Sequence, residues 1–276
     1  MSKRHPTEQS VQKWIERGDG QGTGVNYTPF FHPRDVPSIG RSRLFLGLFI
    51  LRLFVTLSDI EYYYVLLAEY AAFAGFVVDI REQVALIPWE SPQKIATQLR
   101  VRYPIYRGTT IPSVMTSDLV LSIPTRKGVR LLVLCIKPAS ALAHGDRTQE
   151  TRRSRLMELL QIEKEFWSLC GAEWGLHTDK MLPMILVKNL DFTRHTMVGD
   201  ERHYLNTILP AFASTFRRKW SKSRPLNELL AAVSSPLGVS FDDAFALFGR
   251  SIWLRQLPID LHSQLLHHEE PVKLIQ

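Results

Sequence analysis

The sequence is poor in cysteine, and it contains no apolar run long enough to cross a membrane. Cys135 and Cys170 are the two cysteines of its 276 residues. Two are too few for a disulfide scaffold or for a zinc site built on cysteine alone, so a reducing compartment is expected. The longest apolar run covers residues 44–57 and contains Arg52; it is shorter than the roughly 20 residues that a membrane-spanning helix needs. We expect strand material there, either buried or facing a partner.

The sequence also lacks an apolar N-terminal signal, internal repeats and low-complexity tracts, which favours a cytoplasmic location. Its apolar content is high, because hydrophobic residues make up 45% of the chain. That content is enough for one large domain or two ordinary ones. A total of 34 Lys and Arg against 27 Asp and Glu gives a net charge of +7. The excess positive charge favours a polyanionic partner, such as nucleic acid or an acidic membrane surface.

Residues 114–139 are the stretch around which the rest of the chain is organised. Two apolar segments rich in β-branched residues are joined by Thr-Arg-Lys-Gly at residues 125–128, which is a hairpin signal. Asp118 lies at the start of the first segment and Lys137 at the end of the second, so antiparallel pairing brings the two side by side. An acid and an amine at one sheet edge can bind a divalent cation and orient a phosphate, as a nuclease requires.

The spacing of these residues is also that of a known nuclease arrangement. Asp118 is followed after sixteen residues by Cys135, Ile136 and Lys137. That is the outline of the PD-(D/E)xK nucleases, in which a strand aspartate precedes a strand ending in acid, any residue, lysine. Glu61 falls in the first turn of a helix predicted over residues 58–73. It either compensates the helix dipole or supplies a further acid to the site.

The N-terminal part of the chain is predicted to be an α/β domain that ends near Asp179. Residues 18–24 are rich in glycine, but they follow a predicted helix and lack the Gly-Lys-Ser/Thr ending of a phosphate-binding loop. We expect either a flexible backbone contact to DNA or a partner, or a plain loop, followed by an extended lead-in over residues 26–42. The further elements predicted are helices over residues 8–17 and 147–169, a short polar helix or loop over residues 92–100, and strands over residues 77–86 and 174–177.

The C-terminal part has a different pattern and is predicted to be a small, mainly helical or winged-helix-like domain. The predicted elements are helices over residues 204–220, 226–233 and 241–248, followed by a strand over residues 252–259. The domain boundary is therefore placed between residues 1–180 and residues 181–276.

The candidates for binding DNA are basic residues in three settings. Some alternate with aromatic residues, some lie in the turn of the central hairpin, and some cluster at the end of a helix. A solvated surface is an alternative explanation for them. The candidates are Arg102, Arg107, Arg126, Lys127, Arg217, Arg218 and Lys219.

Several ordered segments of the chain resemble TnsA, the endonuclease subunit of heteromeric transposases. The segments are G-x-G-x-G-x-x-Y-x-P at residues 20–29, V-P-S-x-G-R-S at 36–42, L-S-D-x-E at 57–61, D-I-R-E-Q at 79–83, S-D-x-V at 117–120 and K-P-A-x-A-L at 137–142. The resemblance runs from about Gly18 to Asp179. The C-terminal third is similar only in length and general character.

The resemblance implies a restriction-endonuclease-like N-terminal domain that depends on Mg²⁺, with Mn²⁺ as a substitute. Such an enzyme cleaves double-stranded DNA at the 5′ ends of a transposon, and it associates with the nucleoid when active. The implied partners are the transposase TnsB, which cuts and joins the 3′ ends, and the AAA+ regulator TnsC, which the family contacts mainly through the C-terminal region. No membrane partner is expected.

The catalytic set implied by the resemblance is Glu61, Asp118 and Lys137. The metal ligands expected are Glu61, Asp118, the Ile136 carbonyl and Cys135, although this cysteine replaces the glutamine of the family and a thiol is a poor ligand for Mg²⁺. Glu163 aligns with a family acid near the site, with a surface charge on a helix as the alternative.

Two other functions stay open at this stage. A non-catalytic adaptor would keep the nuclease fold only to bridge TnsB, TnsC and DNA, and Cys135 is the feature that favours it. A stand-alone restriction-type endonuclease would cut DNA without partners.

Overall fold

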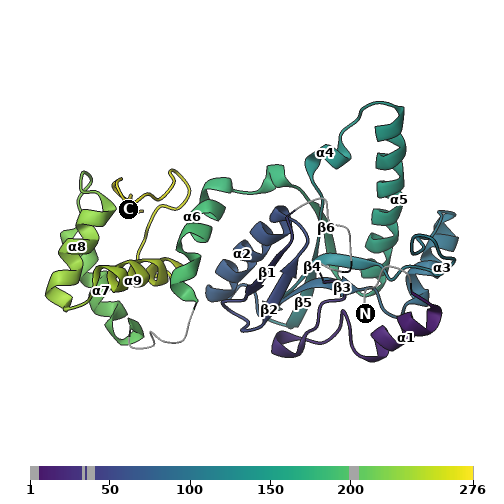
Figure 1. The fold of residues 1–276 in the computed structure, drawn as a ribbon, viewed down its shortest axis with the longest axis horizontal. Coiled ribbons are helices and arrows are strands. Elements are labelled where there is room, and N and C mark those ends of the chain that lie inside the picture. Colours follow the sequence, from purple (N-terminus) through teal and green to yellow (C-terminus); the bar gives the residue numbers. More distant parts are fainter. Residues whose placement is uncertain (1–5, 33–34, 36–40, 199–204, 276) are drawn as a thin grey trace. The chain divides into compact units, whose positions relative to one another are not determined.

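The computed structural model describes residues 6–32, 35, 41–198 and 205–275. It divides into two compact units, Met1–Leu182 and Pro183–Gln276 (Figure 1). Some predictions fall outside the described residues. They concern most of the family segment at residues 36–42, two prolines of the predicted extended lead-in, and the first residue of the helix predicted from residue 204. Within the described part of the chain, no helix is long and apolar enough to span a membrane.

Unit 1 is built on a four-stranded sheet with the strand order β3-β4-β5-β6. The strands are β3 (Asp79–Ala85), β4 (Thr116–Thr125), β5 (Gly128–Ile136) and β6 (Glu173–His177). The first three pair antiparallel, and β6 lies parallel to β5. A parallel neighbour requires a long crossover, which a helix supplies here. The predicted central hairpin and the α/β class are thereby confirmed.

The helices of unit 1 cover both faces of this sheet. They are α1 (Glu8–Glu16), α2 (Asp59–Phe73), α3 (Glu90–Leu99), α4 (Ala139–Leu142) and α5 (Arg147–Leu169), with short 3-10 turns at Gly24–Asn26 and Asp179–Met181. Figure 1 shows α2 on one side of the sheet and α3 with α5 on the other. Val120 and Val133 of the sheet pack against Ile162 and Phe166 of α5. These apolar contacts fix the long helix beside the hairpin.

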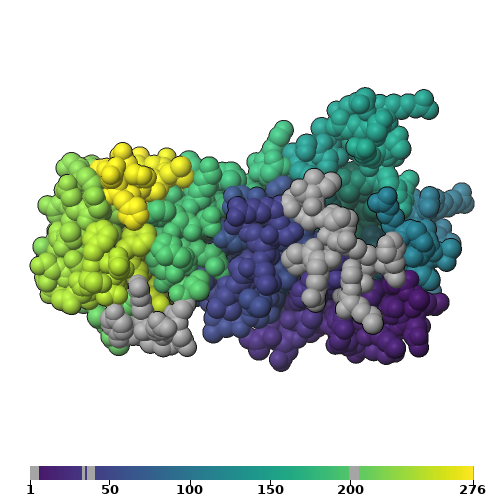
Figure 2. Space-filling model, in the orientation of Figure 1, coloured from purple at the N-terminus to yellow at the C-terminus, as the bar shows by residue number. Residues whose placement is uncertain are grey.

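The two halves of α5 have different environments. The buried residues of this helix begin at Leu160, and every residue before it is exposed or half-buried. The N-terminal half of α5 projects from the rest of unit 1, as the ribbon and the space-filling view both show (Figures 1 and 2). The C-terminal half is therefore the part that can bring side chains to the sheet.

The apolar run at residues 44–57 forms a separate hairpin of β1 (Arg43–Leu46) and β2 (Leu53–Thr56). The prediction of strand material is correct, and the run is divided between interior and surface. Phe54 and Val55 are buried, whereas Leu44 is 59% exposed and Leu51 is 71% exposed.

The glycine-rich loop lies along β3. Gly20 accepts a hydrogen bond from the Ala85 amide at 3.3 Å and donates to the Thr28 carbonyl at 2.7 Å. Gly20 has a φ of +72°, and a Cβ atom there would lie 2.5 Å from Ala85 Cβ. Only glycine allows the loop to approach the strand so closely. Of the alternatives considered from the sequence, this contact favours a structural loop at its Gly20 end.

Unit 2 is helical throughout its regular structure. It contains α6 (Met184–Arg194), α7 (Leu205–Lys219), α8 (Leu226–Leu237) and α9 (Phe241–Trp253), with a 3-10 turn at His195–Met197. The core is formed by large apolar side chains, among them Phe212, Phe216, Phe248 and Trp253.

The strand predicted over residues 252–259 is wrong. Ile252 and Trp253 are buried on the last turn of α9, because the helix capped by Ser240 continues beyond residue 248. The residues that follow make only an isolated bridge between Ile259 and Leu274. The described residues of unit 2 contain no strand, so a winged-helix architecture is not confirmed. Helix α6 was not predicted either.

Candidate active site

Asp118 and Lys137 meet at one end of the β4–β5 hairpin. Lys137 Nζ lies 2.6 Å from Asp118 Oδ2, and the Ile136 amide donates to the same oxygen at 2.6 Å. The register explains the meeting, because Leu119 faces Leu134 and the preceding residue lies beside the end of β5. Burial lowers the pKa of Lys137, but the charge and hydrogen bond of Asp118, together with the neighbouring Cys135 and Glu163, raise it by more, so its pKa is above the ordinary value. The amine is therefore a cation fixed on the acid.

Glu61 takes part in the N-terminal cap of α2, and it also lies near Asp118. Its carboxylate accepts hydrogen bonds from the Leu57 amide at 2.9 Å and the Ser58 hydroxyl at 2.9 Å, and Ser58 Oγ caps α2 by accepting from the Glu61 amide at 3.2 Å. The arrangement is similar to a capping box, with the Leu57 amide in place of the amide of the N-cap residue. The same carboxyl is only 8% exposed. Burial, followed by the nearby charge of Asp118, raises the pKa of Glu61 to about 7. The helix cap thus orients an acid that faces the hairpin.

Glu163 comes to the same place from α5. It is 4% exposed, which excludes the alternative of a surface charge. Its Oε1 accepts from the Ser117 hydroxyl at 2.7 Å, and that hydroxyl accepts from Trp167 Nε1 at 2.6 Å. Burial, and then the charge of Asp118, raises the pKa of Glu163 to about 7. The chain therefore places Glu163 near the predicted catalytic pair.

Cys135 is completely buried, and its thiol donates a hydrogen bond to Glu163. Burial and then the charge of Asp118 raise the pKa of this thiol, so it stays protonated. A protonated thiol is not a metal ligand. A metal-binding role for Cys135 stays a prediction, and these surroundings argue against it.

Negative charge is in excess at this site. The Asp118 carboxylate raises the pKa of both Glu61 and Glu163, and Lys137 is the cation beside them. A divalent cation would relieve this repulsion, since buried charges in proteins are paired or bind metals. Both hydrogen bonds that Asp118 accepts within the described residues end on Oδ2. Its Oδ1 therefore stays available to a ligand.

The donor set fits Mg²⁺. Among the residues that the structure describes, no group of three or more His, Cys, Asp and Glu side chains is placed to hold a metal. The side-chain ligands would then be Glu61 and Asp118, with the Ile136 carbonyl and water completing the shell. Mg²⁺ typically keeps several waters and uses one or two carboxylates, so this small set suits it.

The basic candidates lie apart from one another. Arg102 and Arg107 are exposed in the segment between α3 and β4. Arg126 and Lys127 are exposed at the turn of the β4–β5 hairpin. About eight residues separate that turn from Asp118, which corresponds to roughly 26 Å along a strand. The turn therefore cannot contact the same phosphate as Asp118.

Arg217, Arg218 and Lys219 occupy the last turn of α7 in unit 2. Arg217 donates a hydrogen bond to the Gln256 carbonyl, and the Lys219 carbonyl accepts one from Arg224. Part of this charge thus serves to fix the end of the helix, where cations are favourable. Binding of DNA by this cluster stays a prediction.

Gln83, Ser117 and Trp167 are site residues that the sequence did not single out for a role. The side chain of Gln83 donates to Glu61 Oε2 at 3.3 Å. Gln83 ends the D-I-R-E-Q segment, so the family resemblance contained a signal for it. Ser117 likewise begins the S-D-x-V segment and Trp167 ends a similar family segment, I-E-x-x-x-W at residues 162–167, but their contact with Glu163 depends on where α5 crosses the sheet.

Comparison with known proteins agrees with this geometry. Residues 76–179 match the family described as TnsA-like endonuclease N terminal. The resemblance to TnsA is confirmed. This TnsA-like region contains Asp118, Lys137 and Glu163, whereas Glu61 lies before it. The chain is also 29% identical over 186 residues to the transposon Tn7 transposition protein TnsA of Escherichia coli; the alignment covers 67% of this chain and 62% of that relative. The chain therefore spans less than two thirds of the length of that TnsA.

Proposed function

We propose that this chain is the endonuclease subunit of a heteromeric transposase and that it cuts the 5′ ends of a transposon by Mg²⁺-dependent phosphodiester hydrolysis. The observation that carries the proposal is the Asp118–Lys137 pair, in which Nζ lies 2.6 Å from Oδ2. Both residues belong to the region that matches a nuclease family, and Glu61 lies near them. The crowded carboxylates support the choice of a metal-dependent reaction.

The chemistry divides between the ion and the chain. Bound Mg²⁺ neutralises charge on the phosphate and lowers the pKa of a coordinated water. Glu61 and Asp118 would hold the ion, with Oδ1 of Asp118 facing it because Oδ2 is held by Lys137 and the Ile136 amide. The Lys137 ammonium positions water or counters the negative charge that develops in the transition state. Glu163 supports β4 and β5 through Ser117 and Cys135.

The partners in this proposal follow from the resemblance to TnsA. TnsB would cut and join the 3′ ends, and TnsC would contact unit 2. Double-stranded transposon ends would be the substrate, with the exposed basic residues Arg102 and Arg107 as candidates for backbone contacts. Such a protein acts in the cytoplasm and associates with the nucleoid during transposition.

Replacing Asp118 by Ala tests the proposal in a system reconstituted with TnsB and TnsC. The variant removes a metal ligand and the partner of Lys137, so 5′ nicking should be lost while 3′ joining by TnsB continues. The products should then be cointegrates. Glu165→Gln, which changes an exposed acid on α5, is the matched control and should yield simple insertions. Simple insertions from the Asp118 variant would show that the active site is assigned wrongly.

A nuclease-fold adaptor without activity is the second candidate. Cys135 favours the adaptor, because this buried residue occupies the position of the family glutamine and its thiol is hydrogen-bonded to Glu163. Soaking crystals with Mn²⁺ separates the two functions. An ion between Glu61 and Asp118 supports the nuclease, whereas none at high concentration supports the adaptor. Cutting of DNA by the purified chain alone would instead indicate a stand-alone endonuclease.

A further inference from the structure

Strand β3 is interrupted beside the active site. In its register with β4, Glu82 faces Leu119 and Val84 faces Ser117, so Gln83 lies opposite Asp118, although these two are not paired in the ladder. Gln83 has a φ of +52°, in the left-handed region that is uncommon for residues other than glycine. It is also 2% exposed. A buried backbone conformation of this kind costs roughly 1–3 kcal/mol and persists only when its surroundings impose it.

The glycine-rich loop and the segment after it impose this conformation. The Phe30 amide donates to the Gln83 carbonyl at 3.1 Å, and the Ala85 amide donates to the Gly20 carbonyl at 3.3 Å. The N-terminal segment therefore holds β3 at Gln83 and two residues after it. Gly20 is required for this approach, because a Cβ atom there would collide with Ala85.

The side chain of Gln83 reaches from this left-handed position into the site. Its Nε2 lies 3.3 Å from Glu61 Oε2, and its Oε1 lies 3.2 Å from Thr116 Oγ1. An ionised carboxylate only accepts hydrogen bonds, so the amide must present its N–H to Glu61. The Thr116 hydroxyl donates to the opposite end of the amide and fixes that orientation. The chain of contacts runs from β4 through β3 to α2.

This contact differs from the other two that Glu61 receives. The donors Leu57 and Ser58 belong to the start of α2 itself, and they would move with the helix. Gln83 belongs to the sheet that also carries Asp118. It therefore links the acid on the helix to the acid on the strand, whose separation decides whether one ion contacts both.

We propose that Gln83 is a positioning residue that holds Glu61 at the distance from Asp118 which a divalent cation requires, and that Thr116 locks the Gln83 amide in the orientation needed. This inference rests on the proposed function, because it assumes that Glu61 is a metal ligand. It also gives the N-terminal glycine-rich loop a function, which is to maintain the left-handed conformation of Gln83.

The test measures Mn²⁺ binding to the purified full-length chain by electron paramagnetic resonance. Gln83→Asn keeps an amide and tolerates the left-handed backbone, but it is one methylene too short to reach Glu61. Its Mn²⁺ affinity should fall roughly 10-fold, at the lower end of the range for lost partners of metal ligands. Thr116→Val should weaken binding, whereas the matched control Thr116→Ser, which keeps the hydroxyl, should bind as the wild type does. Cleavage by Gln83→Asn should recover when the Mn²⁺ concentration is raised.

Glu61→Gln separates failure of this inference from failure of the proposed function. If Glu61→Gln loses Mn²⁺ while Gln83→Asn and Thr116→Val bind it as the wild type does, the role of Gln83 is refuted and the metal site stands. If Glu61→Gln also binds Mn²⁺ normally, the metal site itself is wrong. Thermal unfolding of each variant shows whether it is folded. Should Gln83→Asn fail to fold, the Thr116 pair decides, because valine has nearly the shape of threonine.

Discussion

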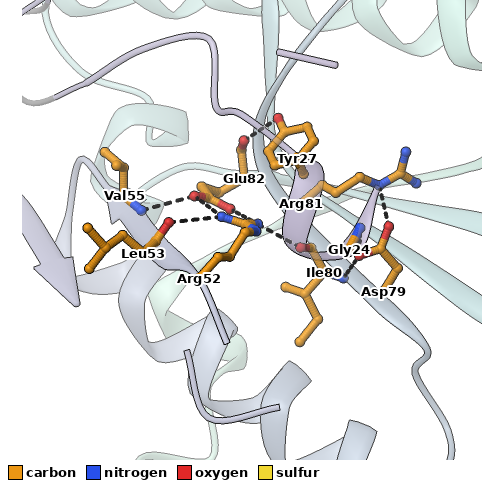
Figure 3. Close-up of polar contacts among 9 residues, drawn as sticks. All are labelled: Gly24, Tyr27, Arg52, Leu53, Val55, Asp79, Ile80, Arg81 and Glu82. Atoms are coloured by element: carbon orange, nitrogen blue, oxygen red, sulfur yellow. Dashed lines mark hydrogen bonds and ion pairs between the residues drawn. The ribbon is translucent and has the colours of Figure 1, made fainter. Parts of the chain in front are cut away.

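Unit 1 contains two buried groups of charges that are built in different ways. In the first, Arg52 binds Glu82 through two hydrogen bonds of 2.6 and 2.9 Å (Figure 3). The same guanidinium donates to the carbonyls of Ile80 and Leu53, and Glu82 also accepts from the Val55 amide. One positive charge meets one negative charge, and backbone groups bond to both. This pair ties the β1–β2 hairpin to β3.

The second group, at the active site, is not balanced. Glu61, Asp118 and Glu163 lie around the cation Lys137, and the pKa values of both glutamates are raised to about 7 by burial and by the charge of Asp118. Burial also raises the pKa of Glu82, but there Arg52 opposes the change. The fold therefore contains a neutral buried pair where the charge has a structural role. It keeps excess negative charge where the proposed reaction needs a cation.

Asp118→Asn is the strongest test of the difference between the two buried groups of charges. The change removes a ligand of the proposed ion but keeps the shape of the side chain, so 5′ nicking should fall at least about a thousandfold, since a metal ion contributes several kcal/mol to catalysis. The free energy of unfolding should change by no more than about 1 kcal/mol, because the repulsion with Glu61 and Glu163 is lost together with the bond to Lys137. Nicking assays and urea unfolding measure the two effects. A large loss of stability would mean that the site is structural.

Arg52→Met should show the opposite behaviour. It leaves Glu82 buried without its partner, which costs about 3–5 kcal/mol in the free energy of unfolding. Arg43→Met is the matched control, because the Arg43–Asp59 pair is more exposed and should contribute less than about 1 kcal/mol. Cleavage per folded molecule should be unchanged in both. Equal losses of stability in the two variants would contradict the distinction between the pairs.

The dependence of stability on pH should come from the unbalanced group. The pKa values of Glu61 and Glu163 are raised from 4.5 to about 7 in the folded chain. The folded state therefore binds protons more tightly than the unfolded state, and the stability that this adds is complete below about pH 4.5 and is lost as the pH rises through 7. Mn²⁺ competes with these protons, so it should raise the unfolding temperature more at about pH 8 than at about pH 6. Asp118→Asn should weaken the response; an unchanged response would place the ion elsewhere.

Short-range relations explain which parts of the site were predictable. Asp118 and Lys137 belong to one hairpin, so strand pairing alone brings them together. Glu61 lies on a distant helix, and the proposal of a catalytic role for it came from the resemblance to TnsA and not from its own pattern. The conformation of Gln83 depends on contacts with the N-terminal segment, which no local pattern reveals. The more a residue's position depends on contacts between distant parts of the chain, the less of its role could be predicted from the sequence.

The same reason accounts for the error in unit 2. Residues 252–259 are rich in apolar side chains, which fits a strand, but Ile252 and Trp253 also continue the buried face of α9. A short apolar run cannot distinguish the two possibilities. The Ser240 cap decides where the helix begins, whereas packing in the core of unit 2 decides where it ends.

The smallest effect is expected for Cys135, and it tests which carboxyls belong to the ion. A buried thiol that stays protonated and donates to Glu163 contributes a hydrogen bond and no ligand, so Cys135→Ser should leave the affinity for Mn²⁺ nearly unchanged. Cd²⁺ provides the sharper measurement, because a soft cation favours thiolate ligands. Equal Cd²⁺ affinity of the wild type and the variant is expected. Tighter binding of Cd²⁺ by the wild type would make Cys135 a ligand and would move the ion from Glu61 towards β5.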